Sequence, residues 1–188
     1  MSAAASSVGH LSPAVFPSLR ARNLNRRTFH LPGDFEGQRN VVIVAFEREH
    51  QALVDSWSTV IQELLVCHRD LHSYELPTIS RGHPLFRAWL NGAMRAGIPD
   101  RQVREHTITL YVDKGAFRAA LGLPHERTIY LLLLHRDGRV VWRGGGPVTP
   151  AVADQLKAAL AAGQGASAGV RPSQGPPAVG PSLSAGPS

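Results

Sequence analysis

Cysteine is almost absent from this sequence, since Cys67 is the single example among 188 residues. One thiol cannot form a disulfide within the chain, and cysteine alone cannot build a metal site here. Long apolar runs are also missing, because the longest, IYLLLL, is far too short to span a bilayer. The sequence therefore excludes a disulfide scaffold and predicts no membrane-spanning helix.

The first 33 positions contain no acidic residue and are rich in Ser, Ala and Arg. The first acid is Asp34. This composition resembles a mitochondrial transit peptide. The competing interpretation, which we favour, is a short disordered tail leading into the first strand, because RRTFHLP alternates as strands do. No basic start followed by an apolar core marks a secretory signal. We expect a soluble cytoplasmic protein, with a mitochondrial location as the alternative.

The charge is basic, with a formal net charge of +6 and a pI of about 10.4. Such a balance suggests contact with nucleic acid, anionic lipid or an acidic partner, but an arginine-rich genome composition produces it too. No dense basic run is present. The only weak cluster consists of Arg20, Arg22, Arg26 and Arg27. At most, weak and non-specific binding to nucleic acid is expected.

Both ends of the chain are low in complexity. Residues 163–188 consist mainly of Gly, Pro, Ser and Ala, which cannot bury enough apolar area to offset the entropy of ordering. We expect disordered tails at 1–19 and 163–188, with one folded domain at 20–162.

Strand and helix patterns alternate within this domain. Strands are expected at 28–31, 41–46, 71–76 (ending at Pro77) and 106–112, and in a final hairpin; helices are expected at 53–65, 84–97, 114–122 and 150–162. The hairpin turn is Asp137–Gly138, whose residues suit positive φ angles. Thr149 is expected to cap the last helix, with Pro150 at its first position. This order predicts an α/β fold, a mixed sheet with helices on both faces.

This order of strands and helices resembles the thioredoxin-like superfamily in its peroxiredoxin-like variant. The resemblance includes LPGDFEGQRNVVIVAF at the start of the domain and IYLLLLHRDGRVVW near its end. The closing segment, IYLLLLHRDGRVVWRGGGPVTPAVADQL, is similar to the end of the mitochondrial chaperone that helps the membrane a subunit enter F-type ATP synthase. The resemblance implies a bacterial relative of that chaperone family, with a three-layer thioredoxin-like fold and a role in protein assembly.

The stretch VVIVAFEREH lacks the cysteine that the resemblance predicts there. In redox-active members, the loop after this strand carries a cysteine at a helix N-terminus, where the dipole lowers the thiol pKa. Residues 46–50 here read FEREH and contain no thiol. The cis-proline that faces the dithiol also has no match, since Arg127 and Thr128 precede the hairpin strand. Thioredoxin chemistry is therefore not expected.

Two alternatives remain open at other positions. Cys67 is a candidate nucleophile with His68 as its base, although neighbouring residues rarely face each other and a helix C-terminus disfavours a thiolate. His68 and His72 have the spacing of helical metal ligands, but the segment has the pattern of a helix end, a loop and a strand. We favour a structural or incidental cysteine, no metal and no cofactor. RGGGP at 143–147 is interpreted as a glycine turn and not as a phosphate loop.

The residues after the first long strand are also candidates for binding. AWLNGAMRAGIPD resembles a stretch that lies beside this loop in the bacterial relatives. That placement would bring Arg48, His50, Gln51, Asn91 and Arg95 together, a set suited to an anion or a carbonyl group. The equally weighted alternative is that Trp89 and Met94 belong to the core and Arg95 is a solvated helix residue.

We therefore expect a redox-inactive thioredoxin-like protein that works by binding another protein, such as a subunit of ATP synthase during assembly. A thiol-dependent peroxidase or reductase using Cys67 is the alternative, and a basic nucleic-acid-binding protein is the third hypothesis.

Overall fold

The computed structural model describes residues 14–80, 82 and 100–167. The strands are β1 (Leu19–Asn23), β2 (Thr28–Leu31), β3 (Arg39–Ala45), β4 (Leu71–Ser80), β5 (Ile108–Val112), β6 (Tyr130–His135) and β7 (Val140–Gly145). The helices are η1 (Arg48–His50, a short 3-10 turn), α1 (Gln51–Ser56), α2 (Ser58–Cys67), α4 (Arg101–His106), α5 (Lys114–Leu121) and α6 (Pro150–Ser167). The helix expected at 84–97 lies outside the described residues.

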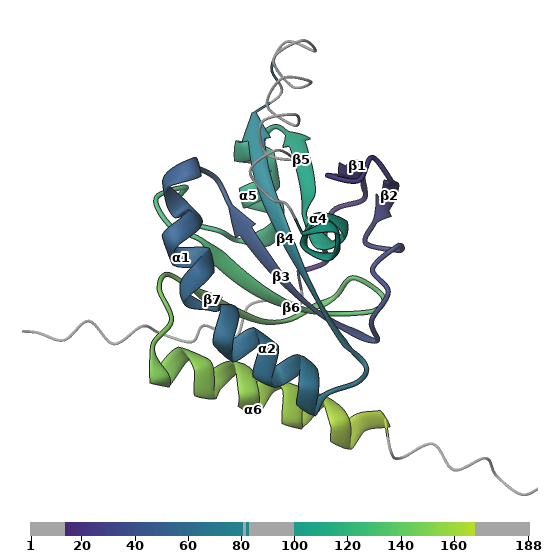
Figure 1. Ribbon diagram of the computed structural model, residues 1–188, viewed down its shortest axis with the longest axis vertical. Helices are drawn as coiled ribbons and strands as arrows, with labels where there is room; N and C mark the ends of the chain where they lie inside the picture. Colours follow the sequence, from purple (N-terminus) through teal and green to yellow (C-terminus); the bar gives the residue numbers. More distant parts are fainter. Residues whose placement is uncertain (1–13, 81, 83–99, 168–188) are drawn as a thin grey trace, which may run out of the picture.

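The strands form one seven-stranded sheet in the order β2-β1-β5-β4-β3-β6-β7 (Figure 1). β3, β4 and β5 are parallel neighbours, whereas β6 and β7 run antiparallel to β3 and to each other. The predicted mixed sheet is confirmed.

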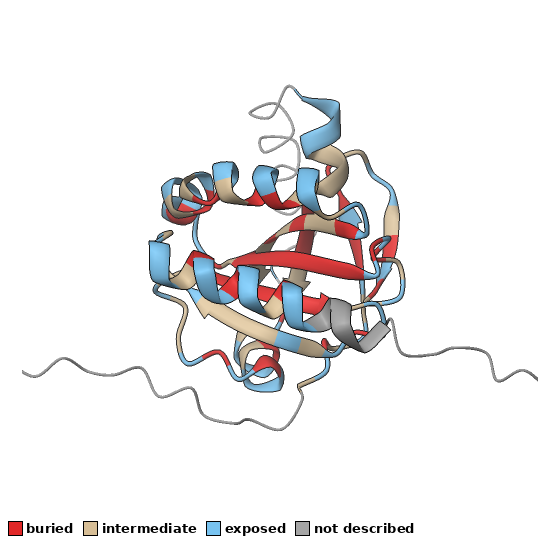
Figure 2. Ribbon diagram, turned by 90° about the horizontal axis from the view of Figure 1, so that it is seen from below, coloured by how far each residue is buried: buried red, intermediate tan, exposed pale blue. Residues whose placement is uncertain are grey.

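Helices cover both faces of this sheet. α1, α2 and α6 pack on one face, where Trp57 and Leu156 are fully buried with Val41 of β3. α5 packs on the other face through Phe117 and Leu121. Buried residues accordingly follow the central strands and the inner sides of the helices (Figure 2). The predicted three-layer arrangement is confirmed.

Local signals placed several boundaries correctly. Gly138 has a φ of 84° in the β6–β7 turn, and Gly122 ends α5 with a φ of 62°. At the start of α6, the Val152 N–H donates to Thr149 Oγ1 at 3.3 Å, which is the expected side-chain cap.

The expectation that the strand at 71–76 ends at Pro77 is wrong, since β4 continues to Ser80. The register explains why proline is tolerated there. Pairing with β3 ends at Ala45–Pro77, so the missing N–H of proline falls at the last pair of that ladder. On the β5 side, a bridge from Glu75 to Thr107 and the pairs from Thr78 onward carry the strand past the proline.

Ordered structure also includes part of the stretch expected to be a tail. β1 begins at Leu19, and the Phe16 side chain is 1% exposed in the core. None of the helices in the part of the chain described here is long and apolar enough to cross a membrane.

Candidate functional site

The junction after β3 lies at the sheet edge where the parallel strands end, which is the usual place for ligands in such sheets. Phe46 is buried, whereas Glu47, Arg48 and Glu49 are exposed as the chain turns into η1. We call residues 46–51 the β3 edge.

His50 holds the β3 edge together from within. Its side chain is buried, and the Phe46 N–H donates to His50 Nδ1 at 3.3 Å. Nδ1 therefore carries no proton, and Nε2 bears it, 3.9 Å from Glu47 Oε2. His50 thus positions the backbone of the junction and is not an accessible binding group.

Of the other predicted binding residues, the structure brings Arg48 and Gln51 to the surface of the same edge. The Gln51 side-chain amide donates to Asp55 Oδ1 at 2.9 Å. Arg48 is exposed and forms no ion pair within the described part of the chain. Asn91 and Arg95 lie outside the described residues.

Lys114, which the sequence analysis missed, reaches the β3 edge from the start of α5. Its Nζ donates to the Phe46 carbonyl at 2.9 Å and lies 3.3 Å from Glu126 Oε2. Arg118 Nε binds the other Glu126 oxygen at 3.2 Å. A signal was present in the sequence, because Lys114 follows the strand at 108–112 and parallel strands end at the same edge. Glu126 neutralises these cations, so they are not free to hold an anion.

Glu75 on β4 is a second group that sequence patterns did not identify. It is half-buried and pairs in register with Ile43, so it lies on the sheet face covered by α1 and α2. Burial raises the pKa of the Glu75 carboxyl, and the negative charge of Asp55 raises it further. This carboxyl therefore holds a proton more readily than an ordinary glutamate.

The thiol lies far from the β3 edge. Cys67 is the exposed last residue of α2, at the opposite end of the α1–α2 segment from His50 (Figure 1). His68 is the residue after the helix, and its N–H donates to the Leu64 carbonyl at 2.9 Å. His72 lies on β4, so it shares no helical face with His68. In residues 14–80, 82 and 100–167, no group of three or more His, Cys, Asp or Glu side chains could hold a metal ion.

The segment interpreted as a glycine turn is mostly strand. Arg143, Gly144 and Gly145 belong to β7 and pair with β6, and Gly146 alone turns, with a φ of 81°. Its carbonyl accepts a hydrogen bond from Trp57 Nε1 at 3.0 Å. The turn is therefore held to Trp57, the residue between α1 and α2.

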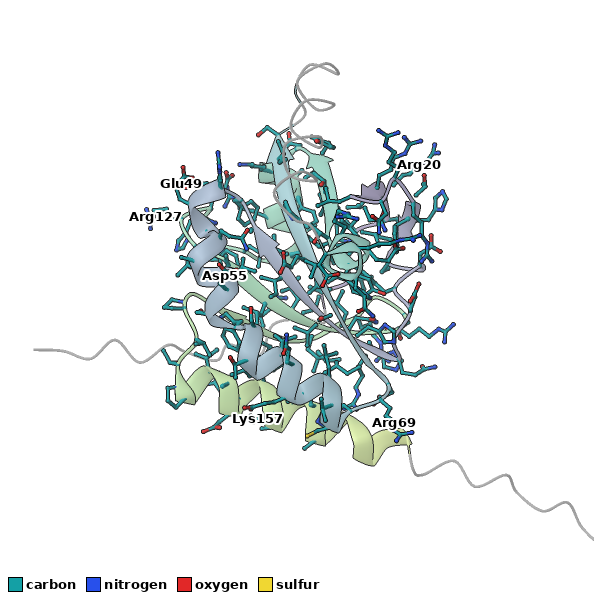
Figure 3. The ribbon with its side chains drawn as sticks, viewed as in Figure 1. Arg20, Glu49, Asp55, Arg69, Arg127 and Lys157 are labelled. Carbon is teal, nitrogen blue, oxygen red and sulfur yellow. The ribbon has the colours of Figure 1, made fainter. Side chains whose placement is uncertain are left out.

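The arginine cluster of the third hypothesis is partly neutralised. Arg27 binds Glu36 at 2.9 Å and Glu105 at 3.3 Å, and the hydrogen bond to Glu36 raises its pKa. Arg20 and Arg22 are exposed on β1. Figure 3 places Arg20 on the side of the molecule opposite Glu49, so this cluster and the β3 edge are separate surfaces.

No protein-family model matches the chain. No curated protein matches it either. Solved structures do match in fold. A proposed electron transfer protein from Aquifex aeolicus VF5 superimposes with a TM-score of 0.54 at 10% identity, over 79% of this chain and 95% of that one. A hypothetical protein from Sinorhizobium meliloti 1021 gives 0.53 at 13% identity, over 82% and 85%. BsSco, of the Sco family of cytochrome c oxidase assembly proteins, gives 0.51 at 12% identity, over 78% and 94%.

The fold is thioredoxin-like. The β3 edge is the loop in which the resemblance described above predicted the cysteine of redox-active thioredoxin-like proteins. It holds Glu47, Arg48, Glu49 and buried His50 instead. The only cysteine of the sequence is at the end of α2.

Proposed function

We propose that this protein binds a protein partner through the β3 edge and performs no thiol–disulfide chemistry there. The observation that carries the proposal is the composition of the edge: no thiol, an exposed arginine, and a backbone fixed at Phe46 by His50 and Lys114. A rigid backbone lowers the entropy lost on binding, because the contact groups are already in place.

Arg48 is the proposed anchor for the partner. Its exposed guanidinium offers planar donors that fit a carboxylate in a bidentate way. Glu47 and Glu49 flank it and keep the local charge balanced, which disfavours indiscriminate binding of anions.

The proposed role is folding or assembly of the partner. BsSco, similar in fold, belongs by its description to a family of cytochrome c oxidase assembly proteins. The closing segment of this sequence resembles a chaperone of ATP synthase assembly. Together they support an assembly factor, with an ATP synthase subunit as the first partner to test.

Arg48→Ala should weaken capture of the partner by about tenfold or more, since a hydrogen bond to a charged group contributes about 1.5–3 kcal/mol. The melting temperature should stay nearly unchanged, because the side chain is exposed. Cross-linking in cells followed by quantitative mass spectrometry measures capture. Arg20→Ala, an exposed arginine on another surface, is the matched control. Equal capture by the wild type and Arg48→Ala would remove the anchor from the proposal.

The enzyme alternative depends on Cys67, which is exposed and therefore accessible to oxidants. We expect neither peroxide consumption nor disulfide reduction above background from the wild type, and no change in Cys67→Ser. Both proteins are assayed side by side with dithiothreitol as the reductant. Robust turnover in the wild type that disappears in Cys67→Ser would establish the enzyme and refute the binding proposal as stated.

A further inference from the structure

The two edges of the sheet, β2 and β7, differ in whether their outer backbone groups are occupied. On β2, the His30 N–H donates to Asp34 Oδ2 at 2.7 Å, and the His30 carbonyl accepts from the Asp34 N–H at 3.1 Å. Asp34 thus closes this edge against another strand, a common protection of edge strands.

β7 keeps an open edge. Tyr130 pairs with Gly145, and the Gly146 N–H donates to the Ile129 carbonyl at 3.1 Å. This pattern makes Tyr130–Gly145 a pair without mutual hydrogen bonds, and Leu132–Arg143 another. The N–H and carbonyl groups of Gly145 and Arg143 therefore point away from β6. Among the described residues, no hydrogen bond reaches these four groups.

The same edge already accepts a strand at its beginning. Val15 forms an antiparallel bridge with Arg139, and the Val140 N–H donates to the Ala14 carbonyl at 2.8 Å. The free part of the edge follows after a register shift that leaves Val141 without a partner on β6, and the Val141 side chain is 53% exposed. Backbone and apolar side chain together thus offer a site for an extended segment.

Arg143 favours a bound segment that carries an acidic side chain. It is half-buried on the α5 face, its guanidinium lies against Gly122, and its buried Nε has no hydrogen-bond partner. Burial lowers the pKa of this guanidinium. Within the described residues no carboxylate pairs with it, and a half-buried unpaired charge is unfavourable. The segment that precedes Ala14, residues 1–13, contains no acid that could pair with it.

We propose that the open part of the β7 edge, Val141–Gly145, binds an extended segment of a protein partner as an additional strand, with an acidic side chain opposite Arg143. Main-chain hydrogen bonds would supply affinity and the acid would supply specificity, as in other strand additions. The proposal rests on the proposed function only in that the partner is a protein, because it uses a surface other than the β3 edge.

Two random peptide display libraries, one with a fixed central Glu and one with a fixed central Lys, test this proposal on the full chain. The wild type should enrich peptides from the Glu library, and Arg143→Glu should enrich peptides from the Lys library instead. Arg143→Pro removes the guanidinium and also an outward-facing N–H, at an edge strand where proline is tolerated. This variant should bind the selected peptides more weakly than the wild type, on the order of tenfold or more. Arg20→Glu is the charge control and should bind like the wild type.

Amide hydrogen exchange by NMR distinguishes strand addition from other binding. A bound peptide should slow exchange of the Arg143 and Gly145 amides on the order of tenfold, and this readout stays valid if Arg143→Pro fails to fold. Enriched peptides that leave these amides unprotected, or no enrichment at all, would overturn the proposal. So would protection without peptide, which would mean that the chain itself or a second copy covers the edge. Arg48→Ala should bind these peptides as the wild type does. The proposal for the β7 edge can therefore be tested even if the proposal for the β3 edge fails.

Discussion

Replacing Phe16 with alanine should lower the free energy of unfolding by about 3–5 kcal/mol, the range for a buried phenylalanine. Its side chain is 1% exposed, and its ring meets Phe35 and Phe117 edge-to-face, with centroids 5.7 and 5.8 Å away. The ring joins the turn after β2 to α5 on the other side of the sheet from α6. Denaturant unfolding followed by circular dichroism measures the change.

Val15→Ala is the matched control, since its side chain is 54% exposed and should change stability by no more than about 0.5 kcal/mol. A chain that begins at residue 20 should lose as much stability as Phe16→Ala, or more, because the Phe16 N–H bond to the Gly138 carbonyl disappears as well. Equal stability of Phe16→Ala and the wild type would show that this ring contributes nothing to the core.

The sequence predicted the parts of the fold that depend on local chemistry. The turn at Asp137–Gly138 and the cap at Thr149 each need a particular residue in a particular backbone conformation, and both were found where expected. The apolar run before Phe46 marks a strand that is buried on both faces, and β3 is such a strand.

Features that depend on distant partners were not visible in the sequence. β1 has only five residues, and its pattern is set by one face on the core and one exposed face of arginines. Phe16 lies among Pro, Ser and Ala, so composition alone placed it in a tail. Pro77 suggested a strand end because the sequence pattern does not show how β4 pairs with its two neighbouring strands, and so whether the N–H at this position would be hydrogen-bonded.

The candidate site was predictable in the same limited sense. The absence of a thiol from FEREH follows from the sequence once the strand is placed. The burial of His50 does not, because its hydrogen bond to the Phe46 N–H depends on how η1 turns back. Lys114 and Glu126 are brought to the edge by tertiary structure, from the start of α5 and from the loop before β6.

The second large effect is expected at Arg39, which ties three segments together at the opposite end of β3. Its Nε and Nη2 bind both Asp70 oxygens at 2.8 Å, and its Nη1 donates to the Leu160 carbonyl of α6 at 2.6 Å. Arg39→Met keeps the apolar stem but removes all three hydrogen bonds. Because Asp70 is half-exposed and water can solvate its freed carboxylate, we expect a loss of about 1.5–3 kcal/mol of unfolding free energy, the range for a hydrogen bond to a charged group. Arg69→Met, at an exposed neighbouring arginine, should be nearly neutral.

The same contact predicts how stability depends on pH. The hydrogen bond from Arg39 holds the pKa of Asp70 below its ordinary value. Because the folded pKa lies below the unfolded one, the contribution of Asp70 is fully present above about pH 4, and it is lost as the pH falls through the folded pKa. Asp70→Asn should therefore be less stable than the wild type at neutral pH, and this difference should shrink in acid. Urea unfolding of both proteins from neutral pH to about pH 3 measures it. A difference that stays constant over this range would mean that the charge of Asp70 does not stabilise the fold.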